Sequence, residues 1–199
     1  MRRTSTGLLV LVLALAGGVF SNEWFGHAGH TDGLTLKLDA RKTSLRVGEE
    51  TDVRLVLKNE GRRSVRLVEP GDGSESGWRT PVVAWSIIKD DPAAPHPPEP
   101  FRGVRARECG NVGGLRWGEV FSLAPGETKE LWQWGAFLPR FEEPGVYRVV
   151  FLYANRPSMS WVSEQGRPLV FNNPFEMWRV RHSTEATAVS NELVFTVRD

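Results

Sequence analysis

Apolar and polar side chains alternate through Thr51-Asp52-Val53-Arg54-Leu55-Val56-Leu57-Lys58. Successive side chains of an extended strand point to opposite faces, so Val53, Leu55 and Leu57 share one face of such a strand. The pattern therefore predicts a β-strand with one buried face and one wet face.

Further segments carry similar patterns. Turn residues fill 59–63 and the alternation resumes over 64–68, so we expect the two strands to form an antiparallel hairpin. Other strand candidates, all short, are 34–40, 81–88, 117–123, 127–134, 147–154 and 192–197. No segment has a sustained helical stripe, and short connections leave no room for crossover helices. The pattern therefore predicts an antiparallel all-β fold.

Two Pro-Gly pairs predict tight turns between strands. Pro125-Gly126 and Pro144-Gly145 each combine a fixed φ with a residue that tolerates positive φ. Tyr147 follows the second pair, just inside a strand. In immunoglobulin-like sandwiches a Tyr at this place ties its hydroxyl to the backbone at the corner. Tyr147 is therefore our candidate for such a corner, with an ordinary strand Tyr as the alternative.

Several of these motifs resemble secreted immunoglobulin-like β-sandwich domains. The resemblance rests on Arg46-Val47-Gly48-Glu49 before a strand, Leu57-Lys58-Asn59 at its end, the two Pro-Gly turns and the closing segment 190–197. It implies an antiparallel immunoglobulin-like β-sandwich, here with two long irregular excursions. A narrower similarity is to BsuPI-type intracellular proteinase-inhibitor domains, although no inhibitory residues match. The segment 71–81 also looks like that of uncharacterised exported bacterial proteins, a resemblance that supplies no activity.

The N-terminus has the order of a secretory signal peptide. Arg2 and Arg3 precede an apolar run at 7–20, and small residues end the segment. The run is shorter than the roughly 20 residues that span a bilayer, so we expect cleavage and no remaining membrane span; an uncleaved anchor is the alternative. We divide the chain into a signal peptide (1–21), a flexible mature N-terminus (22–33) and one sandwich domain (34–199). The expected location is exported: periplasmic, cell-envelope or secreted.

Composition narrows the function classes. Removing Arg2 and Arg3 from the 25 basic residues leaves one fewer than the 24 acidic residues, so we expect no nucleic-acid partner. One Cys permits no intrachain disulfide, and eight Trp and ten Phe must supply the packing. Four Trp that lie in strand candidates are expected to be structural: Trp85, Trp117, Trp132 and Trp134.

The glycine-rich segment 71–81 holds four of our candidate binding residues. Asp72 and Glu75, with Ser74, offer oxygen ligands for Ca²⁺, but the full EF-hand pattern is absent and a structural loop is the preferred interpretation. Trp78 and Arg79 offer stacking and bidentate hydrogen bonding to a partner. The alternative is that Trp78 covers the sandwich edge while Arg79 pairs with Asp72 or Glu75.

Two irregular excursions interrupt the strands. The first, at about 90–114, contains the proline-rich run 92–100 and is the leading candidate for an interaction site. The second, 155–188, is rich in apolar residues, and we expect it to fold against the sandwich with short strands or a helical turn. Its residues Trp161 and Trp178 complete the tentative binding set, because exposed aromatic rings can stack on sugars. Covering of the core is the preferred interpretation for them.

Enzyme motifs are weak. Cys109 could act as a nucleophile with His96 or His182, and His27 and His30 have the spacing of a partial metal site. No protease signature or nucleotide-binding glycine motif accompanies them. We therefore expect no enzyme activity, no metal and no cofactor. The preferred function is an exported binding domain for a protein or another envelope component, with carbohydrate binding and proteinase inhibition as alternatives.

Overall fold

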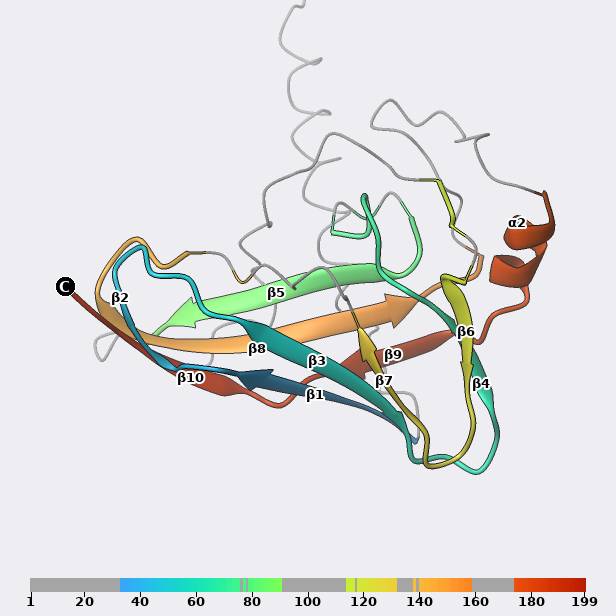
Figure 1. The fold of residues 1–199 in the computed structure, drawn as a ribbon, viewed down its shortest axis with the longest axis horizontal. Helices are drawn as coiled ribbons and strands as arrows, with labels where there is room; N and C mark the ends of the chain where they lie inside the picture. Colours follow the sequence, from blue (N-terminus) through green and yellow to red (C-terminus); the bar gives the residue numbers. More distant parts are fainter. Residues whose placement is uncertain are drawn as a thin grey trace, which may run out of the picture.

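The computed structural model describes residues 33–75, 77, 79–90, 114–116, 118–131, 138, 140–158 and 174–199. These ranges contain ten strands and one helix. Figure 1 shows strands β1, β3 and β7 lying across β5, β8 and β10, with the helix at one end. The expected all-β fold is confirmed. The proposed domain boundaries stay a prediction, and the signal segment 1–21 lies outside the described residues.

The first sheet has three antiparallel strands. Its order is β1 (Leu34–Ala40), β3 (Val53–Asn59) and β7 (Thr128–Leu131). Alternate residues of β1 and β3 point into the molecule, and Leu55 and Leu57 are 1% and 0% exposed. The alternation in the sequence therefore identified the buried face of β3 correctly.

The second sheet is larger and almost wholly antiparallel. Its order is β2 (Ser44–Arg46), β10 (Leu193–Arg198), β8 (Gly145–Asn155) and β5 (Val82–Lys89), and β9 (Ala186–Val189) also pairs with β8. The exception is β2, which runs parallel to β10. A parallel bridge joins Leu36 of β1 to Ser190, just before β10. Because β2 continues the path of β1 after the chain changes sheets, it also meets β10 in the parallel sense.

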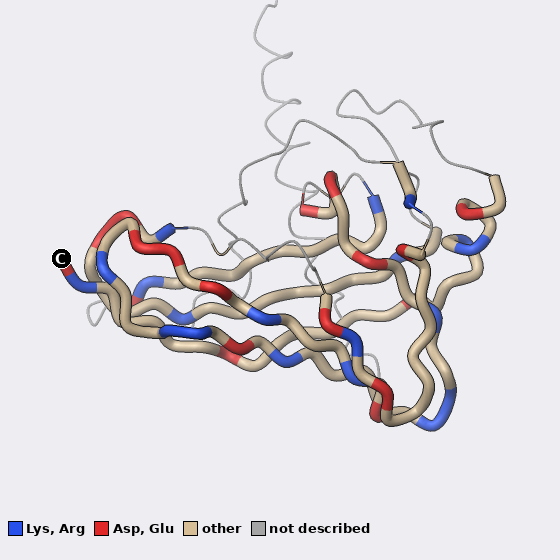
Figure 2. Tube along the Cα trace, in the orientation of Figure 1, with Lys and Arg blue, Asp and Glu red and all other residues tan. Residues whose placement is uncertain are grey.

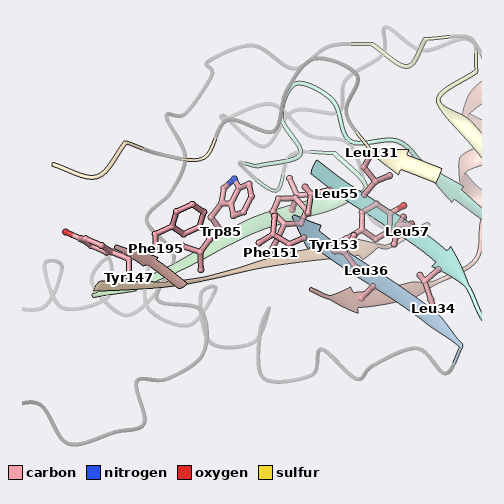
Figure 3. Packing of buried hydrophobic residues seen from close by; sticks show 14 of the residues in the cluster. Leu34, Leu36, Leu55, Leu57, Trp85, Leu131, Tyr147, Phe151, Tyr153 and Phe195 are labelled. Carbon is pink, nitrogen blue, oxygen red and sulfur yellow. The ribbon is translucent and has the colours of Figure 1, made fainter. Parts of the chain in front are cut away.

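The hydrophobic core lies between these two sheets. Leu34, Leu36, Leu55 and Leu57 face Trp85, Phe151, Tyr153 and Phe195, as Figure 3 shows. The rings of Trp85 and Phe151 meet edge to face with centroids 4.6 Å apart. Trp85 is 3% exposed, which confirms its structural role. Trp117, Trp132 and Trp134 lie outside the described residues.

The tyrosine corner is confirmed. The Tyr147 hydroxyl donates to the Glu143 carbonyl at 2.9 Å, across the turn that precedes β8. The ring packs on Phe141 with centroids 4.6 Å apart. Tyr147 therefore fixes the entry of the longest strand into the second sheet.

The predicted hairpin of β3 with the next strand is wrong. β4 (Val65–Val68) pairs with β6 (Val120–Leu123), whereas β3 pairs with β1 and β7. The two chain segments 53–68 and 120–131 run side by side as one antiparallel ribbon that bends at its middle. Both edges of β3 are therefore occupied, and β4 cannot fold back on it.

Asn59 forms the corner of this ribbon. Its side-chain amide donates to the carbonyls of Arg63 and Leu123, both at 2.9 Å, and its oxygen accepts from the Gly61 amide at 3.0 Å. The turn predicted at Pro125-Gly126 lies opposite: Gly126 has φ 81°, and the Gly126 amide donates to the Asn59 carbonyl. The turn is real, but the strands that it joins lie in different sheets.

The described part of the second excursion contains a short helix and a short strand, in line with the expected short strands or helical turn. The helix is α2 (Pro174–Arg181), followed by β9. The expectation that this segment folds against the sandwich is met here, because Val180 of α2 packs on Val68 and Val120. In the described ranges no helix is long and apolar enough to cross a membrane. Most of the first excursion, 91–113, lies outside those ranges.

Candidate binding surface

The described part of segment 71–81 is a tight loop closed by its own backbone. The Ser74 amide donates to the Gly71 carbonyl at 2.9 Å, and the Gly71 amide donates back to the Ser74 hydroxyl at 3.1 Å. Ser74 is fully buried, Asp72 is exposed and Glu75 is half-buried. No group of three His, Cys, Asp or Glu side chains within the described ranges is placed to hold a metal ion. The Ser74 hydroxyl therefore stabilises the loop by accepting a hydrogen bond from the Gly71 amide.

Arg79 is the most deeply buried cation of the described chain. Its side chain is 1% exposed, and its Nη2 donates to Glu119 Oε2 at 2.8 Å. The same carboxylate oxygen accepts the Arg116 amide at 3.0 Å. The pair joins the 71–81 loop to the segment before β6. A guanidinium in this position is a structural group of the loop and is not presented at the surface.

Trp78 and Trp161 of the predicted set lie outside the described residues. The same holds for Cys109, His96, His27 and His30. Of the predicted binding residues, the structure therefore places Asp72, Glu75, Arg79 and Trp178, the first three in the loop and Trp178 in α2.

Helix α2 has two unlike faces. Glu176 and Val180 are buried, with Met177 half-buried against the same small cluster. Arg179 fastens this side, since its Nη2 donates to the Val120 carbonyl at 2.7 Å and its Nη1 meets the Glu176 carboxylate at 3.2 Å. The inner face is thus held by apolar packing and by a charged pair.

The outer face carries a row of aromatic rings. Phe175 and Trp178 are 54% and 51% exposed. Their rings are stacked, with centroids 6.2 Å apart and planes 17° apart. The exposed His182 ring lies 4.4 Å from that of Trp178, and its Nδ1 is 2.7 Å from the Trp178 carbonyl oxygen. We call these three residues the aromatic row.

The aromatic row corrects one expectation. Covering of the core was the preferred interpretation for apolar residues of the second excursion, and it holds for Met177. It is wrong for Phe175 and Trp178, because the helix turns their positions away from Val68 and Val120. A spacing of three and then four residues places these rings on one helical face.

Exposed arginines lie at the same end of the molecule as this face (Figure 1). Arg181 ends α2, and Thr184 lies just beyond it. The Thr184 amide donates to the Arg66 carbonyl of β4 at 2.6 Å, and the Arg66 amide donates to the Thr184 hydroxyl at 3.0 Å. Arg62 and Arg63 occupy the turn before β4. Figure 2 shows basic residues along this end of the molecule. We call Arg62, Arg63, Arg66 and Arg181 the arginine group.

The arginine group differs from most other cations. Lys37, Arg41, Lys42, Arg54, Lys58, Arg79, Lys89, Lys129, Arg140, Arg148 and Arg179 all form salt bridges. No member of the arginine group forms one with any residue that the structure describes. Their side chains are exposed to solvent; Arg181 lies in α2 with the aromatic rings, and Arg66 lies on a strand that is hydrogen-bonded to the segment after α2.

Local signals for α2 were present in the sequence. Pro174 stands at the first helical position, where its missing N–H costs nothing, and Glu176 lies in the first turn. Arg179 and Arg181 complement the dipole in the last turn. Phe175 and His182 were missed as surface residues because apolar side chains stand on both faces and leave no single stripe.

Comparisons with known proteins add little. No family model matches the chain, and no curated protein matches it. A solved structure that is similar is the CARDB domain of a Pyrococcus furiosus protein, determined in complex with di-metal ions. The identity is 14%, the TM-score is 0.35, and the match covers 83% of this chain and 87% of that chain. At these values we draw nothing about function from the likeness, and the similarity to BsuPI-type domains is not shown.

Proposed function

We propose that this chain is an exported, non-enzymatic binding domain that contacts an envelope component through the outer face of α2. The observation that carries the proposal is the aromatic row, in which Phe175 and Trp178 are each about half exposed. Contiguous exposed apolar side chains rimmed by polar ones mark interaction sites. Trp is also among the residues that most often dominate binding energy.

The non-enzymatic part of the proposal is supported by the use of the buried polar groups. Asn59 holds the ribbon corner, the Ser190 hydroxyl accepts from the Phe151 amide, and Arg79 pairs with Glu119. The exposed Asn191 also bridges the sheets, because its side chain exchanges two hydrogen bonds with the backbone of Leu38. Each of these groups serves the fold.

Binding can be tested by sedimentation of the purified mature chain with envelope fragments from its own cells. We expect Phe175→Ala/Trp178→Ala to weaken binding by about tenfold or more, as for a hot-spot residue. The matched control is Val194→Ala, since Val194 is 47% exposed on β10. Retention of the double variant at the wild-type level would contradict the proposal.

Carbohydrate binding is the second candidate, and the exposure of Trp178 favours it. Sugar rings stack on a free aromatic face. In α2, Phe175 lies one turn before the Trp178 ring and His182 one turn after it, so both sides of the ring have neighbours. A glycan array on which Trp178→Ala abolishes a selective signal would support this candidate. A protease panel tests the inhibitor alternative.

A further inference from the structure

Resting on the proposed function, we infer that the aromatic row and the arginine group bind the surface of an anionic phospholipid bilayer. The row supplies side chains suited to the lipid interface, and the group supplies charge opposite to that of the headgroups.

The shape of the aromatic row suits an interface better than a sugar. Phe175 stacks with Trp178 at a 17° angle between the ring planes, His182 lies 4.4 Å from the Trp178 ring, and Phe175 and Trp178 still remain about half exposed. Binding at the boundary of headgroups and acyl chains depends on the apolar area that is buried and on attraction to anionic lipids, so it requires no free ring face for stacking. Trp is enriched at such boundaries.

The arginine group supplies the complementary charge. Arg66 and Arg181 lie on neighbouring segments, because Thr184 bonds to Arg66 and follows Arg181 by three residues. Neither forms a salt bridge within the described chain, so binding to phosphate requires no existing pair to break. Basic residues beside an anionic membrane each add attraction, which decreases as salt is added.

Placement at one end of the molecule makes simultaneous contact feasible. Figure 1 shows α2 and β4 at the end opposite to β2 and the C-terminus. The outer face of α2 is turned away from Val68 and Val120, and the sandwich therefore lies behind it. A flat surface can approach the aromatic row without meeting the two main sheets first.

The experiment uses the mature chain and two kinds of vesicle. One kind contains equal parts of phosphatidylglycerol and phosphatidylcholine, and the other contains phosphatidylcholine alone. We expect sedimentation with the anionic vesicles only, with binding that weakens as salt is raised. Equal binding to both kinds, or binding that salt leaves unchanged, would overturn the inference.

Two charge variants provide a matched comparison. Arg66→Gln/Arg181→Gln and Arg46→Gln/Arg198→Gln each remove two positive charges, the second pair from neighbouring strands at the opposite end. Neither Arg46 nor Arg198 forms a salt bridge with another described residue. We expect the first variant to lose about tenfold or more in vesicle binding and the second to stay near wild type. Equal losses would contradict a localised site.

Trp178→Ala tests the aromatic part, with Val194→Ala as its control. We expect Trp178→Ala to weaken vesicle binding and Val194→Ala to leave it unchanged. Thermal unfolding of each variant shows whether the chain is folded. If envelope fragments bind through Trp178 while no vesicle does, the bilayer inference fails and the proposed function stands. Capture by a soluble acidic polysaccharide without vesicle binding overturns the bilayer inference in the same way. If envelope fragments do not bind at all, the proposed function fails.

Discussion

Arg79 and Glu119 form a salt bridge at 2.8 Å, with side chains 1% and 15% exposed. The pair connects two segments that are 40 residues apart. Gly71 lies directly against it: a Cβ added there would be 2.6 Å from Arg79 Nη1 and 2.9 Å from its Cζ. The loop therefore closes around the guanidinium, and a glycine provides the room.

The first prediction concerns this buried pair. Arg79→Met keeps an apolar stem but leaves the Glu119 carboxylate without its cation, and breaking such a pair costs about 3–5 kcal/mol. Urea unfolding should show a loss in this range. The control is Arg54→Met, because the Arg54–Glu130 bridge is 62% and 50% exposed and should contribute less than about 1 kcal/mol. Similar losses in the two variants would contradict the structural role of Arg79.

The second prediction couples Gly71 to Arg79. Gly71→Ala should destabilise the wild-type chain, because the guanidinium is held by Glu119 and cannot move away. In an Arg79→Ala background the same change should cost less, since the obstructing group is gone. A double-mutant cycle measures the difference. Additive losses would show that the contact does not constrain the loop.

The third prediction compares two tyrosine hydroxyls. Tyr147→Phe removes the bond to Glu143 and should cost about 1 kcal/mol. Tyr153 is fully buried and donates to the Val68 carbonyl at 2.7 Å, and burial raises the pKa of its hydroxyl. Tyr153→Phe should cost about 1–3 kcal/mol, because it leaves a buried carbonyl with one partner fewer. Chemical denaturation measures both, and a larger loss for Tyr147→Phe would be the contrary result.

Prediction from sequence succeeded where one residue pattern decides one local structure. Alternation located β1, β3 and β8 closely, and the Pro-Gly pair before Tyr147 identified the corner. Which strands pair with each other was harder to predict. Both β3 and β4 have strand patterns, and the partner of each comes from the distant segment 120–131. The bend at Asn59 separates the β3–β7 pair from the β4–β6 pair. The local sequence there indicates only a polar turn.

The proposed binding surface could be predicted only in part from the sequence, for a similar reason. Trp178 was selected as a stacking candidate, but its exposure depends on which face of α2 meets Val68 and Val120. The arginine group combines residues from the β3–β4 turn with one from the end of α2. Arg66 and Arg181 are far apart in the sequence, and their segments meet through the Thr184 bonds and the packing of Val180 on Val68.

The fourth prediction concerns acid. The hydrogen bond from the Lys42 ammonium and then that from the Arg46 amide lower the pKa of Glu49 below its ordinary value of 4.5. The bond from Lys89 does the same for the pKa of Glu143. A carboxyl group with a lowered pKa in the folded state stabilises the fold above its unfolded pKa, and this contribution is lost as the pH falls through the folded pKa.

The free energy of unfolding should therefore decrease as the pH is lowered from about 4.5. In Glu49→Gln/Glu143→Gln the decrease should be smaller, because these two groups no longer take up protons. Urea unfolding at a series of acidic pH values checks this. A double variant with the same pH profile as wild type would show that the two bonds do not form in solution.

The fifth prediction separates the faces of α2. Val180 is 1% exposed, and Val180→Ala removes buried methyl groups, so it should cost about 1–3 kcal/mol in unfolding experiments. Trp178→Ala removes a larger side chain from a surface position and should cost less than about 1 kcal/mol. Only the Trp178 variant should weaken binding to envelope fragments. If Trp178→Ala were the more destabilising change, the ring would be supporting the fold, and the aromatic row could not be assigned to a partner.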